Sequence, residues 1–164
     1  MKQLSLEGLN FSTTEVNIKD KVMTITLDRP EKKNAMNNVM MNEINYLLAY
    51  AKQEKDIRVV VFAANGDVFC AGADLSRTES KSNVPRLENS DDISLSLRHL
   101  YKPVICKIQG PVLAGALLIV SNATHAIAVD EATFSAPEIH RGLWPFMVMA
   151  GLFRVMPKLS LIHI

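Results

Sequence analysis

Residues 110–130, GPVLAGALLIVSNATHAIAVD, are the stretch on which the interpretation of the chain depends. The stretch opens with small residues and a proline, continues through a nearly unbroken apolar run, and carries no charge before Asp130. Such a run predicts a buried helix, and its glycine-rich start is a place where a ligand can approach backbone N–H groups. Tight turns and close packing explain the same small residues without any ligand, so both interpretations stay open.

The segments before this stretch alternate between strand and helix patterns. Residues 21–27 alternate with a period of two and are rich in β-branched residues, which predicts a strand. Residues 36–55 carry apolar side chains at helical spacing, with Asn37 or Asn38 as the N-cap. Residues 58–64 form a continuous apolar run, which is typical of a strand buried on both faces.

The rest of the chain continues the alternation. Residues 76–92 are polar and predict a loop. The other expected elements are a short helix at 93–101 with Asp91 and Asp92 as caps, strands at 103–108 and 125–129, and an apolar helix at 145–156. Alternating strands and helices in a chain of 164 residues predict one domain of the α/β class.

Composition excludes several classes of protein. A formal net charge of +1 argues against a nucleic acid or an anionic membrane as the main partner. Cys70 and Cys106 are far apart, so the sequence indicates neither a disulfide framework nor a metal site, and reduced thiols are expected. The first residues lack a signal-peptide pattern, and the apolar run at 111–120 is too short to span a membrane. We therefore expect a cytoplasmic protein.

Two glycine-rich turns and one carboxylate are the places where chemistry is expected. FCAGADL at 69–75 and LAGAL at 113–117 each follow a predicted strand and contain mostly small residues. Two backbone N–H groups that converge on one oxygen form an oxyanion hole. Glu138 lies in a short and otherwise apolar stretch, FSAPEIH at 134–140. Taken alone, each turn is explained by packing, and Glu138 by a cap or surface role.

Four stretches taken together resemble the crotonase superfamily, the enoyl-CoA hydratase and isomerase group. They are TITLDRPEKKNAMN (24–37), VFCAGADLS (68–76), KIQGPVLAGALL (107–118) and FSAPEIHRGLWP (134–145). The resemblance covers residues 15–158 in the same order and spacing. It implies a spiral of ββα repeats and an acyl-CoA thioester as the substrate, with no separate cofactor. It also implies a homotrimer or hexamer when the protein is full length.

The resemblance assigns roles to individual residues. The backbone N–H groups of Ala73 and Gly115 are expected to hold the thioester oxygen, and Glu138 is expected to act as the acid and base. The residues expected to contact the substrate and its CoA group are Lys33, Ala35, Ala71, Ala73, Asp74, Leu75, Ser76 and Gly115. From the residues themselves, Asp74 is expected to hold its turn through local hydrogen bonds, whereas Arg29 and Arg141 are either structural or in contact with CoA phosphates.

The sequence departs from the family pattern at Leu118. Hydratases of the family carry a first glutamate there and a second one at the position of Glu138. With one carboxylate, the expected activity is a Δ3,Δ2-enoyl-CoA isomerase. The alternatives are a hydratase, another single-glutamate lyase or hydrolase, and a CoA-binding homologue without catalysis. Phe134, Ile139 and Trp144 are expected to provide apolar surroundings for Glu138.

The last residues do not continue the family pattern. Residues 1–158 are expected to form a crotonase-like core domain that is incomplete at its C-terminus. LSLIHI at 159–164 is the translation of CTGTCTCTTATACACATC, the end of a transposase adapter, and we expect it to be a non-native tail. A short genuine tail that packs Leu159, Leu161 and Ile164 on the core is the alternative.

Overall fold

The computed structural model describes residues 3–76, 82–87 and 92–160. Most of the predicted loop at 76–92 lies outside these residues, and so do the last four residues of the predicted tail. The core-domain boundary and the tail therefore stay predictions. Within the described ranges, no helix combines the length and the apolar character that crossing a membrane requires.

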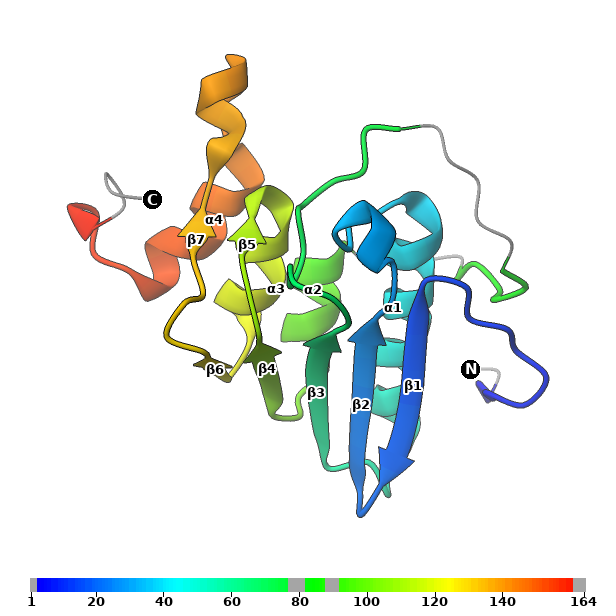
Figure 1. Ribbon diagram of the computed structural model, residues 1–164. Coiled ribbons are helices and arrows are strands. Elements are labelled where there is room, and N and C mark those ends of the chain that lie inside the picture. The colour runs from blue at the N-terminus through cyan, green and yellow to red at the C-terminus, as the bar shows by residue number, and fades with distance from the viewer. Residues whose placement is uncertain (1–2, 77–81, 88–91, 161–164) are drawn as a thin grey trace.

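A five-stranded sheet lies at the centre of the chain, in the order β1-β2-β3-β4-β6 (Figure 1). Its strands are β1 (Thr14–Lys19), β2 (Val22–Leu27), β3 (Val59–Ala64), β4 (Val104–Ile108) and β6 (His125–Ala128). β1 runs antiparallel to β2, and the other neighbours are parallel. A second, parallel pair consists of β5 (Val112–Leu113) and β7 (Phe134–Ser135).

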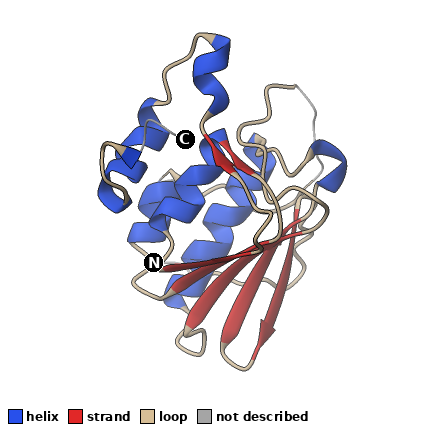
Figure 2. Cartoon of the chain, turned by 60° about the vertical axis from the view of Figure 1, so that its left-hand side comes forward, coloured by secondary structure: helices blue, strands red, loops and turns tan. Residues whose placement is uncertain are grey.

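In the described residues, α1 (Asn38–Gln53), α2 (Ile93–Arg98) and α3 (Leu117–Asn122) connect strands, α4 (Phe146–Val155) follows the last strand, and the helices lie on one side of the large sheet (Figure 2). The 3-10 turns are η1 (Pro30–Lys32), η2 (Ala114–Ala116) and η3 (Pro137–Arg141). Asn37 caps α1 by accepting a hydrogen bond from the Met40 N–H, and Asp92 caps α2 in the same way. The α/β class and the caps Asn37 and Asp92 are confirmed, whereas Asp91 lies outside the described residues.

The core lies between the sheet and the α-helices. Met23, Ile25 and Leu27 alternate along β2 and are fully buried. Ile44 and Leu47 of α1 are fully buried in the same hydrophobic cluster. The period of two in β2 and the helical period in α1 therefore both mark core positions, as expected.

The expectation that β3 is buried on both faces is wrong. Val60 and Phe62 are fully buried under the helices, but Val61 and Ala63 point to the opposite face and are only half-buried. The reason is that the α-helices cover only one face of the sheet. A hollow of about 410 Å³ on the other face contains none of the candidate site residues; its lining is Thr24, Thr26, Val61, Ala63, Ala64, Asn65, Lys107 and Gln109.

The stretch at 110–130 is not a helix from its start. Val112 pairs with Phe134 and Leu113 pairs with Ser135, so the backbone is extended there. Ala114 then adopts a φ of 53°, and regular α-helix begins only at Leu117. The apolar run thus divides into a strand, a 3-10 turn and a short helix, because its first residues have a pairing partner that is distant in the sequence.

β1 is not evident in the sequence, and a buried carboxylate holds its start. β1 is mostly exposed, so its pattern carries little signal. Glu43 of α1 is fully buried and accepts hydrogen bonds from the Ser12 N–H at 2.8 Å and the Thr13 N–H at 3.1 Å. The hydroxyl groups of Thr13 and Thr14 also donate to it. A helix residue therefore fixes the N-terminal edge of the sheet.

Candidate active site

The candidate site is built where β5 and β7 end. Because these two strands are parallel, their carboxyl ends meet at the same edge. Gly115 follows two residues after β5, and Glu138 follows three residues after β7. The pairing therefore brings the second glycine-rich turn and the candidate carboxylate to one edge, although they lie far apart in the sequence.

The two glycine-rich turns are packed against each other. The Leu113 N–H donates to the Cys70 carbonyl at 2.9 Å. Gly72 has a φ of +88°, and a Cβ atom there would lie 2.7 Å from the Ala114 Cβ and 3.1 Å from the Gly115 nitrogen. An L-residue at 72 would be strained and would also displace the second turn. The contact between the turns therefore requires glycine at this position.

Gly115 lies beside the backbone nitrogen of Ala73. A Cβ atom at Gly115 would be 3.8 Å from the Ala73 nitrogen. The carbonyl before Ala73 accepts from the Met36 N–H at 2.7 Å, and the N–H after it donates to the Met36 carbonyl at 2.9 Å. Among the described residues, none accepts a hydrogen bond from the Ala73 N–H. Gly115 lies in the first turn of η2, where N–H groups lack intrahelical partners.

The two segments expected to contact CoA lie side by side. The Ala71 N–H donates to the Lys33 carbonyl at 3.0 Å, and Met36 forms a parallel bridge with Ala73. The segment that contains Lys33 and Ala35 therefore runs along the first glycine-rich turn. Leu75 and Ser76 are exposed where the chain leaves that turn. The structure groups these residues, and their contacts with CoA stay predictions.

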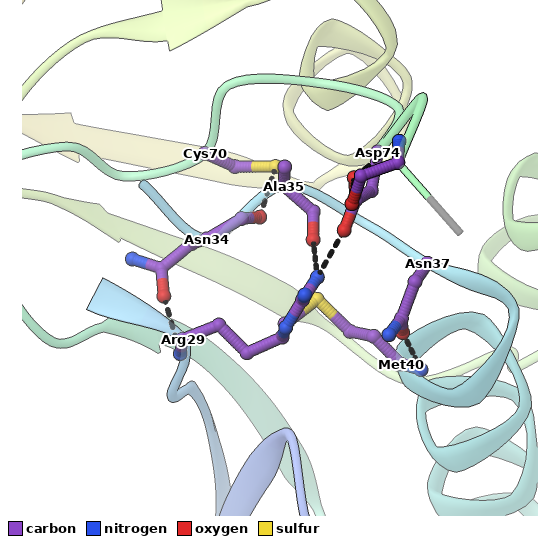
Figure 3. Close-up of polar contacts among 8 residues, drawn as sticks. Arg29, Asn34, Ala35, Asn37, Met40, Cys70 and Asp74 are labelled. Carbon is purple, nitrogen blue, oxygen red and sulfur yellow. Dashed lines mark hydrogen bonds and ion pairs between the residues drawn. The ribbon is translucent and has the colours of Figure 1, made fainter. Parts of the chain in front are cut away.

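A buried ion pair holds this arrangement together. Arg29 Nη1 lies 2.9 Å from Asp74 Oδ2, with side chains 5% and 6% exposed, and it also donates to the Ala35 carbonyl at 2.6 Å (Figure 3). The Ser76 hydroxyl and N–H donate to Asp74 Oδ1. These hydrogen bonds from Ser76, followed by the one from Arg29, lower the pKa of Asp74 to about 2. Asp74 therefore holds the turn, and Arg29 is structural.

Asn34 is a structural residue that the sequence did not reveal. It is fully buried with a φ of 54°, and its side-chain oxygen accepts from the Arg29 N–H at 2.8 Å. Its amide nitrogen donates to the carbonyls of Asn65 and Val68, each at 2.8 Å. One side chain thus joins the turn after β2 to the loop after β3. The only available signal is that asparagine tolerates positive φ better than most residues.

The two cysteines are free and buried. The Cys70 thiol donates to the Asn34 carbonyl at 3.0 Å, and burial raises the pKa of Cys70 and of Cys106 to about 12. Both thiols are therefore protonated at neutral pH and are not nucleophiles. In the ranges that the structure describes, no three or more His, Cys, Asp or Glu side chains gather as they would around a metal ion.

Glu138 lies in η3, which rises away from the rest of the chain above β7 (Figure 1). Its Oε2 atom is buried, and no described residue donates a hydrogen bond to it. Its backbone carbonyl accepts from the Leu143 N–H at 3.0 Å. A buried carboxylate oxygen without a partner is rare in proteins and marks a position where a ligand or water can bind.

The other residues considered near Glu138 contribute less than expected. Phe134, Ile139 and Trp144 are 38%, 60% and 59% exposed, so they do not enclose the carboxyl group within this chain. Leu118, in contrast, is partly buried against the core. That Leu118 stands where hydratases of the family carry a glutamate stays a prediction from the resemblance. His140 and Arg141 are exposed.

Comparisons with known proteins identify relatives of the chain. The family model described as enoyl-CoA hydratase/isomerase matches residues 17–160. A probable enoyl-CoA hydratase of Mycobacterium bovis is 34% identical over 74% of this chain and 46% of its own length. A trans-2-decenoyl-[acyl-carrier-protein] isomerase of Streptococcus mutans is 32% identical over 84% of this chain and 55% of its own length. The chain thus spans about half the length of these relatives.

Solved structures share the fold. A putative enoyl-CoA hydratase/isomerase from Legionella pneumophila superposes with a TM-score of 0.74 at 28% identity, covering 94% of this chain and 62% of that one. An enoyl-CoA hydratase/isomerase from Mycobacterium paratuberculosis gives a TM-score of 0.81 at 24% identity, with the same coverage. The crotonase-like fold predicted from the four sequence stretches is confirmed.

Proposed function

Because the chain belongs to the enoyl-CoA hydratase/isomerase family, we propose that it is part of a Δ3,Δ2-enoyl-CoA isomerase. Its substrate is an acyl-CoA thioester whose double bond lies between C3 and C4. What supports the proposal is that Gly115 lies beside the Ala73 nitrogen, at the same edge as a buried Glu138 oxygen that has no hydrogen-bond partner among the described residues.

The two N–H groups bind the thioester oxygen. When a proton leaves C2, negative charge develops on that oxygen, and two donors that are already in place stabilise it without rearranging. The Met36 hydrogen bonds on both sides of Ala73 supply this rigidity. Loss of one such donor costs about 2.7–4 kcal/mol of barrier in other enzymes.

Glu138 moves the proton. Its carboxylate takes a proton from C2 of the 3-enoyl thioester, and the electron pair of that C–H bond passes to the thioester as an enolate. The same carboxyl group then returns the proton to C4. The double bond now lies between C2 and C3, and Glu138 is ionised again, so the cycle needs no other reactant.

Leu118 supports an isomerase over a hydratase. Addition of water across a double bond uses one group to activate the water and another to protonate the carbon, and Leu118 has no proton to exchange. The Streptococcus mutans relative is named as an isomerase. The Mycobacterium bovis relative is named as a probable hydratase, and hydration is therefore the second candidate. Assembly into trimers or hexamers is also proposed from the resemblance.

Product analysis distinguishes these activities. The chain is incubated separately with 3-hexenoyl-CoA and with crotonyl-CoA, and the products are identified by ultraviolet absorbance, which detects conjugation, and by mass spectrometry, which detects added water. An isomerase converts the first into 2-hexenoyl-CoA, which has the same mass but a conjugated absorbance, and leaves crotonyl-CoA unhydrated. A hydroxyacyl-CoA product from crotonyl-CoA would show that the activity is hydration and not isomerisation. Binding of both thioesters without any turnover would favour a non-catalytic homologue.

A further inference from the structure

Met36 lies between the two backbone segments that form the candidate oxyanion site. Its side chain is 7% exposed, and its Cε atom is 3.6 Å from the position that a Cβ at Gly115 would occupy. The same position is 3.8 Å from the Ala73 nitrogen. The thioether methyl group of Met36 therefore borders the space beside both N–H groups.

The backbone of Met36 cannot easily move away from this place. Its N–H donates to the Gly72 carbonyl at 2.7 Å, and its carbonyl accepts from the Asp74 N–H at 2.9 Å. These two hydrogen bonds flank Ala73 and use only backbone atoms of Met36. A substitution at Met36 thus changes the size of the side chain while it leaves the backbone pairing in place.

We propose that Met36 determines acyl specificity, by excluding thioesters that carry a substituent on C2. This inference rests on the proposed function. The sulfur and the carbonyl group are the same in every acyl-CoA, so the atoms that vary beside the carbonyl oxygen are those attached to C2. A methyl group that borders the oxygen site therefore meets a C2 branch first.

The size of the effect follows from the size of the group. One additional carbon in an apolar pocket changes discrimination by about 10–200-fold. We therefore expect a 2-methyl thioester to bind at least about tenfold more weakly than its straight-chain counterpart. A shorter side chain at 36 creates room of about the size of that methyl group and removes most of this difference.

Binding measurements test the inference separately from turnover. The dissociation constants of crotonyl-CoA and 2-methylcrotonyl-CoA are measured by titration calorimetry for the wild-type chain, Met36→Ala, Met36→Val and Met36→Leu. The ratio of the two constants is expected to fall severalfold in Met36→Ala and less in Met36→Val. Met36→Leu has nearly the original volume and is expected to keep the ratio. If Met36→Ala does not fold, Met36→Val carries the test.

Met23→Ala is the matched control. Met23 is also a buried methionine, but it lies near the start of β2, whereas the candidate site lies where β5 and β7 end. The Met23→Ala substitution is expected to lower the melting temperature and to leave the ratio of the two dissociation constants unchanged. An unchanged ratio in Met36→Ala and Met36→Val, or an equal change in Met23→Ala, overturns the role of Met36. If the wild-type chain binds neither thioester, the proposed function and this inference both fail. If the chain discriminates between the two thioesters but does not isomerise 3-hexenoyl-CoA, only the proposed isomerase activity fails.

Discussion

The candidate site contains two regions that differ in how far their polar side chains are hydrogen-bonded within the chain. We call residues 29–36 together with 71–76 the Arg29–Asp74 turn pair, and residues 137–143 the Glu138 turn. In the turn pair, Arg29, Asn34 and Asp74 are hydrogen-bonded to one another or to the backbone of the neighbouring turn. In the Glu138 turn, one carboxylate oxygen is buried with no partner among the described residues.

This difference suits the turn pair to binding the thioester oxygen and Glu138 to transferring the proton. A network in which each polar group has a partner is rigid, and rigidity is what fixed N–H donors require. A carboxylate that exchanges protons with a substrate cannot have all its hydrogen-bonding positions occupied by the protein. Substitutions in the turn pair are therefore expected to reduce stability, and substitution of Glu138 is expected to reduce activity.

Arg29→Met is expected to have the largest effect on stability. It leaves the Asp74 carboxylate buried without its cationic partner, and breaking a buried pair in this way costs about 3–5 kcal/mol. The lower end is expected because Ser76 still donates to Asp74. Urea denaturation measures the change. Arg58→Met, at an exposed position, is the control and is expected to change stability by less than about 0.5 kcal/mol. Equal losses in the two variants would show that the pair does not hold the turn.

Two glycine substitutions compare the turns directly. Gly72 and Gly142 both have positive φ, but a Cβ atom would clash with Ala114 at Gly72 and would meet nothing within 4 Å at Gly142. Gly142→Ala is expected to cost about 1–2 kcal/mol from backbone strain alone. Gly72→Ala adds overpacking of about 1–3 kcal/mol. Thermal unfolding measures both, and a smaller loss at Gly72 than at Gly142 would contradict the packing of the two glycine-rich turns.

The pH dependence of stability gives a smaller and more specific effect. The pKa of Asp74 is lowered in the folded chain from its ordinary 3.8 to about 2. The stabilisation is therefore fully present above about pH 4 and is lost as the pH falls towards 2. Asp74→Asn is expected to reduce this dependence between pH 4 and pH 2, measured by urea denaturation at each pH. Identical slopes in the wild type and the variant would contradict the shift.

The sequence indicated the core better than it indicated the connections. The period of two in β2 and the caps of α1 and α2 are local signals, and the structure agrees with them. The extended start of the 110–130 stretch depends on pairing with Phe134 and Ser135, and no local pattern reports such a partner. The sequence does not predict β1 because most of its residues are exposed, so they show no alternation of apolar and polar side chains that a buried face would require.

The candidate site was predictable only in part. The proximity of Ala73 and Gly115 followed from the family resemblance, since small residues alone also fit simple packing. The Arg29–Asp74 pair joins residues 45 positions apart, and each of them looks like an ordinary surface charge in the sequence. Nothing in the sequence indicates that the Asn34 side chain bonds to the distant residues Asn65 and Val68 either. Contacts of this kind depend on the folded arrangement of several turns.

The most direct test of the separation between binding and chemistry is Glu138→Gln, assayed for melting temperature, crotonyl-CoA affinity and conversion of 3-hexenoyl-CoA. The substitution keeps the shape of the side chain and removes its proton chemistry. Stability and affinity are expected to change little, while conversion falls by about 10²–10⁴-fold, the usual contribution of a general acid–base group. Wild-type conversion with unchanged affinity would contradict the account.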